Sequence, residues 1–401
     1  MKLYAQYGHA PTDKINRGIE NNLIDGVILS PRYLTPDKAS KFTGELKQIK
    51  DDIDLMLDPE LYATRYIGTP NAQLRYLEEW PYFTDTKRNK LLIDSHVVDQ
   101  ILQKAFKAQV EIGCTQLIAP NIYITNSFDS IEAAIAISFI NRAKPVAEKM
   151  RANLPVYATV AAYRDAIIDR HNFITFLNTL TALEVLPDGI YSLVGGGSAD
   201  ERVGTVRSEV ISPDVIAGWM LLNYSLSLNG IRVINGFSDI LTPFLGAAGG
   251  YAGATGWWSN LQVFSMGRYL KGPTGGQLPL LKYLCLKLLN RIPVNSLKAY
   301  IELIPDLMNN LPTDTYYMGR SEPSRIEEAL QSWEAIKFMT DDIISNNIRE
   351  SLNRLENYIV TAESHYGRLN QLGFSEGFEP NMEYLQCLKE SLKVFEKWAE
   401  L

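Results

Sequence analysis

The sequence predicts a (β/α)8 barrel of the TIM type, an α/β fold, followed by a C-terminal α-helical extension. Short apolar runs alternate with amphipathic helical patterns from the first residues to about residue 271. The runs are almost continuously apolar, which is typical of parallel strands covered on both faces. Eight such runs occur before the pattern changes, and eight strands close a barrel of this type.

Each expected strand is bounded by turn residues or by a helix signal. Thr35 followed by Pro36 is one such signal, because a threonine N-cap and a proline in the first turn favour the start of a helix. The glycine-rich residues 232–258 contain the last two strands, which we expect to close the barrel. The eight strands are expected at residues 2–7, 25–30, 52–58, 114–120, 155–163, 189–197, 232–236 and 251–255.

Two parts of the chain depart from this alternation. Residues 60–94 are polar and aromatic and too long for a routine connection, so we interpret them as an insertion at the barrel mouth. Beyond residue 272 the pattern is helical to the end. We therefore expect a barrel at 1–271 and an extension at 272–401. The extension would pack on the barrel or form an interface with a second copy or a partner subunit.

Composition excludes several classes of protein. The 39 basic and 46 acidic residues give a net charge of −7, so no overall basic field attracts nucleic acid. Cys114, Cys285 and Cys387 lie far apart, which indicates a reducing compartment and neither a structural zinc site nor a disulfide framework. The sequence shows no signal peptide and no apolar run long enough to span a membrane. We expect a cytoplasmic protein without a cofactor.

The ends of the expected strands carry the candidate binding residues, since ligands of such barrels bind at the carboxyl ends of the strands. These residues are mostly neutral hydrogen-bonding and aromatic groups, which suit a flat polar ring or a sugar better than a highly phosphorylated substrate. The candidates are Gln6, Arg32, Tyr62, Asn121, Tyr123, Arg164, Gly195, Gly196, Gly197, Ser198, Asn235 and Trp257.

Asp58, Glu60 and His9 are the candidate catalytic residues. Asp58 and Glu60 alternate by two at a strand end and would face the same way, so each would raise the other's proton affinity. A histidine following a strand end is a second candidate for proton transfer. The alternative for Asp58 is structural, because Asp-Pro often begins a turn. Arg32 would either clamp an anionic group or pair with Asp58.

Two further features have alternative interpretations. The loop at 195–204 would cradle a phosphate, close over the mouth as a lid, or lie in solvent as a surface loop. It lacks the spacing of the established phosphate-binding loops. Trp257 and Trp258 would stack on a ring compound or anchor the last strand by packing. No pattern of histidines or cysteines indicates a metal.

The order of these motifs resembles the tRNA-guanine transglycosylase superfamily, including its DNA-acting 7-deazaguanine relatives. LMLDPELY (55–62) is similar to the family's LxDSGxF segment, PVYATV (155–160) to its PVF-type strand, and GIYSLVGGG (189–197) to its glycine-rich strand. The resemblance implies that Asp58 contacts a base and that Gly195–Gly197 form the platform beneath it. Two features depart from the family: Gly253 stands where the nucleophilic aspartate is expected, and no CxCxxC zinc motif occurs.

Two functions follow from these observations. The first is an enzyme that binds a nucleobase, nucleoside or other polar ring at the barrel mouth, with transglycosylase-like or hydrolytic chemistry and proton transfer by Asp58 and Glu60. The second is a non-catalytic transglycosylase-like barrel that acts as a binding or assembly module, for example as a subunit of a nucleic-acid modification or defence complex. The sequence leaves the choice open.

Overall fold

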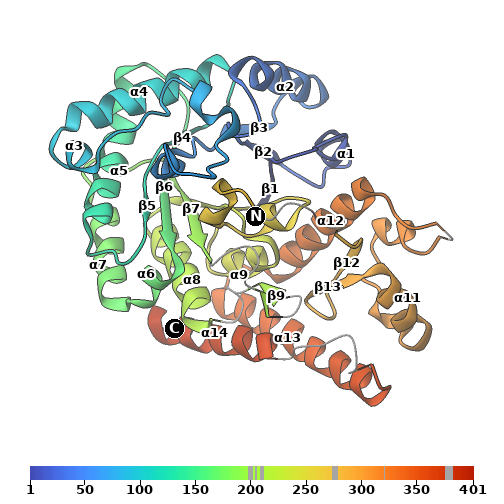
Figure 1. Ribbon diagram of the computed structural model, residues 1–401. Coiled ribbons are helices and arrows are strands. Elements are labelled where there is room, and N and C mark those ends of the chain that lie inside the picture. Colours follow the sequence, from blue (N-terminus) through green and yellow to red (C-terminus); the bar gives the residue numbers. More distant parts are fainter. Residues whose placement is uncertain (197–201, 204–205, 208–211, 273–278, 320, 375–382) are drawn as a thin grey trace.

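Eight parallel strands form the barrel in a computed structural model of the chain (Figure 1). The structure describes residues 1–401 except 197–201, 204–205, 208–211, 273–278, 320 and 375–382. Adjacent strands pair in the order β3-β2-β1-β11-β10-β7-β6-β4, and the short strand β5 (Tyr123–Ile124) also pairs with β6. The bounds are β1 Lys2–Gln6, β2 Gly26–Leu29, β3 Asp54–Leu57, β4 Leu117–Ala119, β6 Val156–Tyr163, β7 Gly189–Gly195, β10 Arg232–Asn235 and β11 Ala252–Thr255.

The barrel closes where the first strand meets the last, as the sequence predicts. β1 pairs in parallel with β11, and Tyr4 lies opposite Ala254. The described strands that end the ladder are β3 and β4, which lie next to each other without pairing as strands. There the Thr115 amide donates to the Leu55 carbonyl at 2.8 Å, and the Thr115 hydroxyl accepts from the Leu55 amide at 2.8 Å. The barrel is thus nearly closed, with its weakest join next to the long insertion.

Helices cover the outside of the barrel (Figure 1). Helix α2 begins where Thr35 and Pro36 predict a helix start. The Thr35 side chain accepts a hydrogen bond from the Lys38 amide, and Pro36 is the first helical residue. The outer helices are α1 Lys14–Glu20, α2 Pro36–Ile49, α4 Ser95–Glu111, α5 Ile131–Lys149, α6 Arg164–Ile168, α7 Arg170–Thr181, α8 Pro213–Leu228 and α9 Thr242–Ala247. A short antiparallel pair, β8 (Arg202–Val203) and β9 (Val206–Arg207), follows β7.

The insertion after β3 folds over the barrel mouth. It contains the 3-10 helices η1 (Leu61–Tyr66) and η2 (Arg75–Glu79) and the helix α3 (Arg88–Ile93). The Trp80 indole N–H donates to the carbonyls of Pro31 and Leu34 at 3.2 and 3.1 Å, which holds the insertion against the end of β2. Its Gln73 amide also donates to the Tyr269 carbonyl at 2.7 Å. The insertion therefore joins the polypeptide that crosses the mouth after β11.

The extension is less helical than the sequence predicts. Residues expected to be helical form an antiparallel hairpin, β12 (Lys282–Cys285) and β13 (Asn290–Pro293). The Gln331 side chain accepts from the Leu284 amide at 2.9 Å and donates to the Leu284 carbonyl at 3.0 Å. This long-range contact overrides the local helical preference of a leucine-rich segment, because it satisfies the backbone of β12 in the extended state.

The remaining elements of the extension pack on the barrel and on each other. Helix α12 contacts α9 and α1, and α14 contacts α8 and α13. The extension contains α11 Val294–Leu303, η6 Pro305–Leu307, η7 Pro312–Tyr316, α12 Arg325–Ile343, α13 Ile348–Gln371 and α14 Glu383–Ala399. Within the described residues, no helix combines the length and apolar character needed to cross a membrane.

Gly253 lies on β11 with its missing side chain directed at α9. A Cβ there would lie 2.3 Å from Cγ2 and 2.5 Å from Oγ1 of Thr242. We expect Gly253→Ala to lower the free energy of unfolding by about 1–3 kcal/mol, because an added methyl group overpacks this contact. Chemical denaturation measures the effect.

Gly44→Ala is the matched control, because nothing lies within 4 Å of a Cβ at this position on α2. It should raise stability by about 0.5–1 kcal/mol, since alanine favours a helix over glycine. Equal stability changes in the two variants would contradict the packing of β11 against α9.

Candidate functional site

Asp58 and Glu60 lie together at the carboxyl end of β3, as predicted, and both are buried. Asp58 Oδ2 accepts from the Tyr62 and Tyr191 hydroxyls at 2.7 and 3.2 Å, and Oδ1 accepts from the Glu60 amide at 3.1 Å. Glu60 adopts a left-handed backbone conformation, with φ 50°, which turns the chain after Asp58-Pro59. The turn that the Asp-Pro sequence suggested as a structural alternative for Asp58 is therefore present together with the buried pair of carboxylates.

Hydroxyl groups from distant parts of the chain hold Glu60. Its Oε1 accepts from the Ser30 hydroxyl at the end of β2, and its Oε2 accepts from the Tyr269 hydroxyl at 2.5 Å. Tyr269 belongs to the 3-10 helix η5 (Met266–Tyr269), which follows β11. Strand ends, the insertion and η5 therefore converge on one pair of carboxylates.

The buried environment shifts the proton affinity of the site. Burial, and next the Glu60 carboxylate, raise the pKa of Asp58 to about 7, although the hydrogen bond from Tyr62 acts in the opposite direction. Burial raises the pKa of Tyr62, Tyr191 and Tyr269 well above the usual value, and the nearby carboxylates add to this effect. These tyrosines are therefore neutral hydrogen-bond donors, while Asp58 can exchange a proton near neutral pH.

Three side chains around the pair have buried polar atoms without a hydrogen-bond partner among the described residues. These atoms are Gln6 Oε1, the Tyr82 hydroxyl, and Nε and Nη1 of Arg268. The Gln6 side chain lies near enough to the Tyr191 hydroxyl to influence its pKa, and the carboxylates of Glu60 and Asp58 influence the pKa of Tyr82. Buried polar groups in proteins are normally paired, so such a concentration indicates where a ligand or water is accommodated.

Arg268 is one of two arginines at this site, because the guanidinium carbon of Arg32 also lies 5.4 Å from the centroid of the Tyr269 ring. Burial lowers the pKa of Arg268, but nearby Tyr269 and Glu60 outweigh that effect, so the pKa is raised overall and the guanidinium stays charged. Its guanidinium carbon lies 4.7 Å from the centroid of the Phe237 ring and 5.8 Å from that of Tyr269. We use the name carboxylate cluster for Gln6, Asp58, Glu60, Tyr62, Tyr82, Tyr191, Arg268 and Tyr269.

An aromatic cover separates the carboxylate cluster from the rest of the mouth. The ring centroid of Phe264 lies 5.2 Å from Tyr62, 5.4 Å from Phe237 and 5.9 Å from Tyr123. The Gly196 amide donates to the Phe264 carbonyl at 3.1 Å, which anchors this segment beside the end of β7. A Cβ at Gly195 would lie 2.0 Å from the Tyr123 hydroxyl, so glycine is needed for this close approach.

Several predicted residues are occupied elsewhere. The side-chain amide of Asn121 donates through Nδ2 to the backbone carbonyls of Thr159 and Ala136, at 2.6 and 3.3 Å. Asn235 and Asn223 exchange two hydrogen bonds, of 2.8 and 3.0 Å, which join β10 to α8. Their polar groups therefore fix the barrel wall.

The three remaining candidates are Arg32, which borders the carboxylate cluster through the Tyr269 ring but bonds other groups, and Arg164 and His9, which lie apart from it. Arg32 donates to the Gln73 carbonyl and the Tyr33 hydroxyl, both at 3.0 Å. Arg164 begins α6 and lies 3.7 Å from Asp165, and His9 is exposed. Of the glycine-rich loop, Gly197 and Ser198 lie outside the described residues.

Sequence reasoning missed Arg268, Tyr269, Tyr191 and Tyr82. Tyr191 could have been found, because it lies within the predicted strand 189–197. Alternate residues of such a strand face the barrel interior, where Tyr191 meets Asp58. Tyr82 lies within the predicted insertion, and Arg268 and Tyr269 lie just before the predicted domain boundary. No local pattern places these three beside Asp58. Within the part of the chain that the structure describes, no group of His, Cys, Asp or Glu side chains could hold a metal ion.

Comparisons with known proteins add little about activity. No family model matches the chain, and no curated protein matches it. Among solved structures, the chain is similar to a glycoside hydrolase family 3 beta-N-acetylglucosaminidase from Paenibacillus sp. str. FPU-7. The TM-score is 0.41 and the identity 12%, over 90% of this chain and 67% of that chain. A likeness at this level carries no argument about substrate or mechanism.

The raised pKa of Asp58 predicts how stability depends on pH. The folded-state pKa of about 7 exceeds the ordinary value of 3.8, so the folded protein holds this proton more tightly than the unfolded chain. The resulting stabilisation is complete below pH 4 and is lost as the pH rises to about 7. We expect Asp58→Asn to remove this slope and to raise the Tm relative to wild type at pH 8. Thermal melts between pH 4 and pH 8 measure it.

Asp54→Asn is the control, because Asp54 lies at the opposite end of β3, where it accepts from Tyr4 and Gln116. This variant should keep the slope between pH 4 and pH 7. A slope that persists in Asp58→Asn would contradict the assignment.

Proposed function

We propose that the protein binds a polar ring compound of the nucleobase or nucleoside class within the carboxylate cluster and hydrolyses it or transfers its glycosyl group. The observation that carries this proposal is the meeting of unpaired buried polar atoms with a carboxyl group of pKa about 7. Titratable groups with such shifts concentrate at functional sites, since acid–base catalysis works best with a pKa near the working pH.

The unpaired atoms match the edge of a heterocyclic ring. Gln6 Oε1 is an acceptor, the Arg268 nitrogens are donors, and the Tyr82 hydroxyl can serve as either. A nucleobase edge offers donors and acceptors side by side. The rings of Phe237 and Tyr269 flank Arg268, so the same place supplies flat apolar surface for the faces of the ligand.

Asp58 supplies the proton transfer in this proposal. Near neutral pH a large fraction of the Asp58 carboxyl is protonated, so it can give its proton to the leaving group as the bond to the ring breaks. An attacking water loses one proton to Asp58, which restores the carboxyl group. Glu60 contributes by raising the pKa of Asp58 and by orienting Tyr269 through their 2.5 Å hydrogen bond.

Hydrolysis by a water molecule fits this barrel better than a covalent mechanism at the position of the family nucleophile. A side chain at Gly253 would meet Thr242 of α9, so the position has no room for a carboxylate. A transglycosylase-like double displacement would need its nucleophile from another strand.

A non-catalytic module is the second candidate. The observation in its favour is that tyrosine hydroxyls already bond Asp58 Oδ2 and Glu60 Oε2, and that Phe264 covers the cluster. In this role the carboxylate cluster would be a polar core that holds the insertion and η5 in place. Binding through the extension would then be independent of Asp58.

The test combines ligand binding with turnover for Tyr82→Phe, Asp58→Asn and Asp54→Asn. A panel of nucleobases and nucleosides should raise the Tm of wild type, and release of free base should follow for one class. Tyr82→Phe should gain about 1 kcal/mol of stability without ligand, because it removes an unpaired buried hydroxyl, and should bind about tenfold more weakly.

Asp58→Asn should retain binding and lose at least about 100-fold in turnover, the usual size of a general acid–base contribution, while Asp54→Asn keeps both. If no compound shifts the Tm and none is cleaved, the catalytic proposal fails and the module remains.

A further inference from the structure

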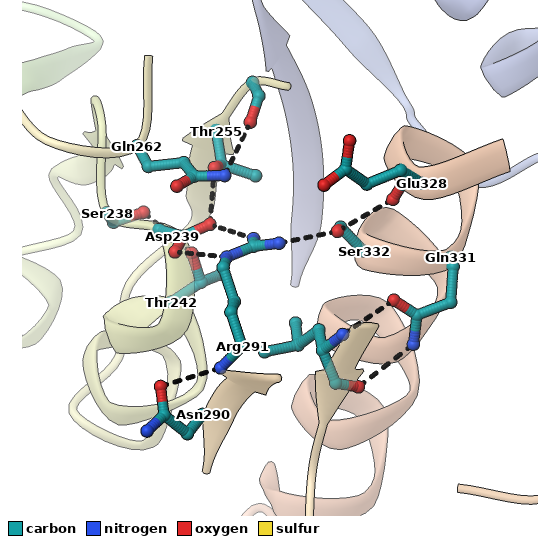
Figure 2. Close-up of polar contacts among 12 residues, drawn as sticks. Ser238, Asp239, Thr242, Thr255, Gln262, Asn290, Arg291, Glu328, Gln331 and Ser332 are labelled. Atoms are coloured by element: carbon teal, nitrogen blue, oxygen red, sulfur yellow. Dashed lines mark hydrogen bonds and ion pairs between the residues drawn. The ribbon is translucent and has the colours of Figure 1, made fainter. Parts of the chain in front are cut away.

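A second pocket lies outside the carboxylate cluster, between the ends of β10 and β11, the hairpin and α12 (Figure 2). Its volume is about 110 Å³, enough for a small ligand rather than a single water molecule. The polar and aromatic residues that matter here are Asp239, Trp257, Trp258, Arg291, Glu328 and Ser332. None of its lining residues belongs to the carboxylate cluster, so the two places are chemically separate.

The backbone after β10 is shaped to present Asp239 at this pocket. Phe237 has φ 56° and Asp239 has φ 42°, both in the left-handed region that residues other than glycine rarely adopt. Such conformations are strained and persist where the surroundings enforce them, often at functional sites. Asp239 Oδ1 accepts from the Thr255 hydroxyl at the end of β11 at 2.7 Å, which fixes the carboxylate.

Arg291 from β13 completes a rigid polar wall. Its Nη2 donates to Asp239 Oδ1 at 2.8 Å and its Nη1 donates to the Ser332 hydroxyl of α12 at 2.7 Å (Figure 2). Three elements far apart in sequence are therefore locked together at the pocket. A polar wall fixed in this way can bind a ligand without reorganising.

Four of the five charged side chains that line the pocket form two ion pairs with each other. Asp239 is bonded to Arg291, and Glu328 accepts from Arg325 Nη1 at 2.7 Å and from the Lys282 amide at 2.9 Å. An ionic ligand would have to compete with these pairs for the same side chains. An uncharged ligand with hydroxyl groups would keep them, because each carboxylate oxygen can accept more than one hydrogen bond.

Two tryptophans supply a flat apolar wall. The indole N–H groups of Trp257 and Trp258 both donate to the His9 carbonyl, at 3.0 and 3.1 Å, so both rings are held in place. Arg325 stacks on Trp258 with its guanidinium carbon 5.5 Å from the ring centroid. Trp258 is only partly buried, and its fixed ring offers a surface on which the apolar face of a ring compound can pack.

We propose that this pocket is a second binding site, for an uncharged, hydroxylated ring compound such as a monosaccharide or the sugar of a nucleoside. The apolar face of the ring packs on Trp258. Its hydroxyl groups hydrogen-bond the fixed Asp239–Arg291 pair and Ser332. This site requires no proton transfer and no residue of the carboxylate cluster, so it goes beyond the function proposed above.

Isothermal titration calorimetry with methyl glycosides and with nucleosides tests this site. Wild type should bind members of one class, and that class identifies the source of the hydroxylated ring. Trp258→Ala should weaken binding at least tenfold. Trp398→Ala is the matched control, because Arg170 stacks on Trp398 at the same 5.5 Å and Trp398 does not line the pocket. It should bind like wild type.

Gln262→Ala is the second variant, because this partly buried side chain lines the pocket and its loss leaves the Asp239–Arg291 pair intact. It should also weaken binding and retain the Tm of wild type. Tyr82→Phe, which should weaken binding at the carboxylate cluster, should bind the ligand of this pocket as wild type does, because Tyr82 does not line the pocket.

Three results would overturn the proposal. Neither class binds to wild type, or Trp258→Ala binds as tightly as Trp398→Ala, or Tyr82→Phe weakens the binding about tenfold. The last result would assign the ligand to the carboxylate cluster and thereby distinguish this inference from the proposed function.

Discussion

Burial of two carboxylates at the end of β3 is the constraint on which the barrel mouth depends. Each charge removed from water needs hydrogen-bond donors or a proton, because an unpaired charge in the interior is too costly. The donors come from the end of β2, from the insertion, from β7 and from η5. The elements that cover the mouth are thus held in place by Asp58 and Glu60, the same carboxylates that could carry out proton transfer there.

The carboxylate cluster and the second pocket are neighbours that share a dividing wall. Phe237 contacts Arg268 on one side and is followed two residues later by Asp239 on the other. Phe264 covers the cluster, while the adjacent Gln262 and Val263 line the pocket. The segment between β11 and η5 therefore sets the shape of both places at once.

The sequence predicts the barrel well because strands covered on both faces are locally encoded. Continuous apolar runs such as those of β2 and β7, in alternation with helical patterns, favour parallel strands covered on both faces. The prediction fails at the hairpin in the extension, where the backbone of Leu284 depends on Gln331 from another element.

The candidate site likewise combines residues that the sequence predicts with residues that only the tertiary fold brings together. Asp58, Glu60 and Tyr62 are close in sequence and at a strand end, so local reasoning brings them together. Arg268 and Tyr82 reach the same place only through the folding of the mouth segments, and Asp239 and Arg291 meet only because the hairpin packs on the barrel. No periodicity in a single sequence records such contacts.

The barrel is least firmly joined between β3 and β4, where the two ends of the strand ladder meet without pairing as strands. Among the described strands the ladder is continuous from β3 round to β4, and the gap is bridged by hydrogen bonds of Thr115 and Gln116 with Leu55 and Asp54. Opening the barrel there breaks few hydrogen bonds, and it moves β3, whose end carries Asp58, away from β4. The join between β3 and β4 therefore depends on side-chain hydrogen bonds as well as on backbone ones.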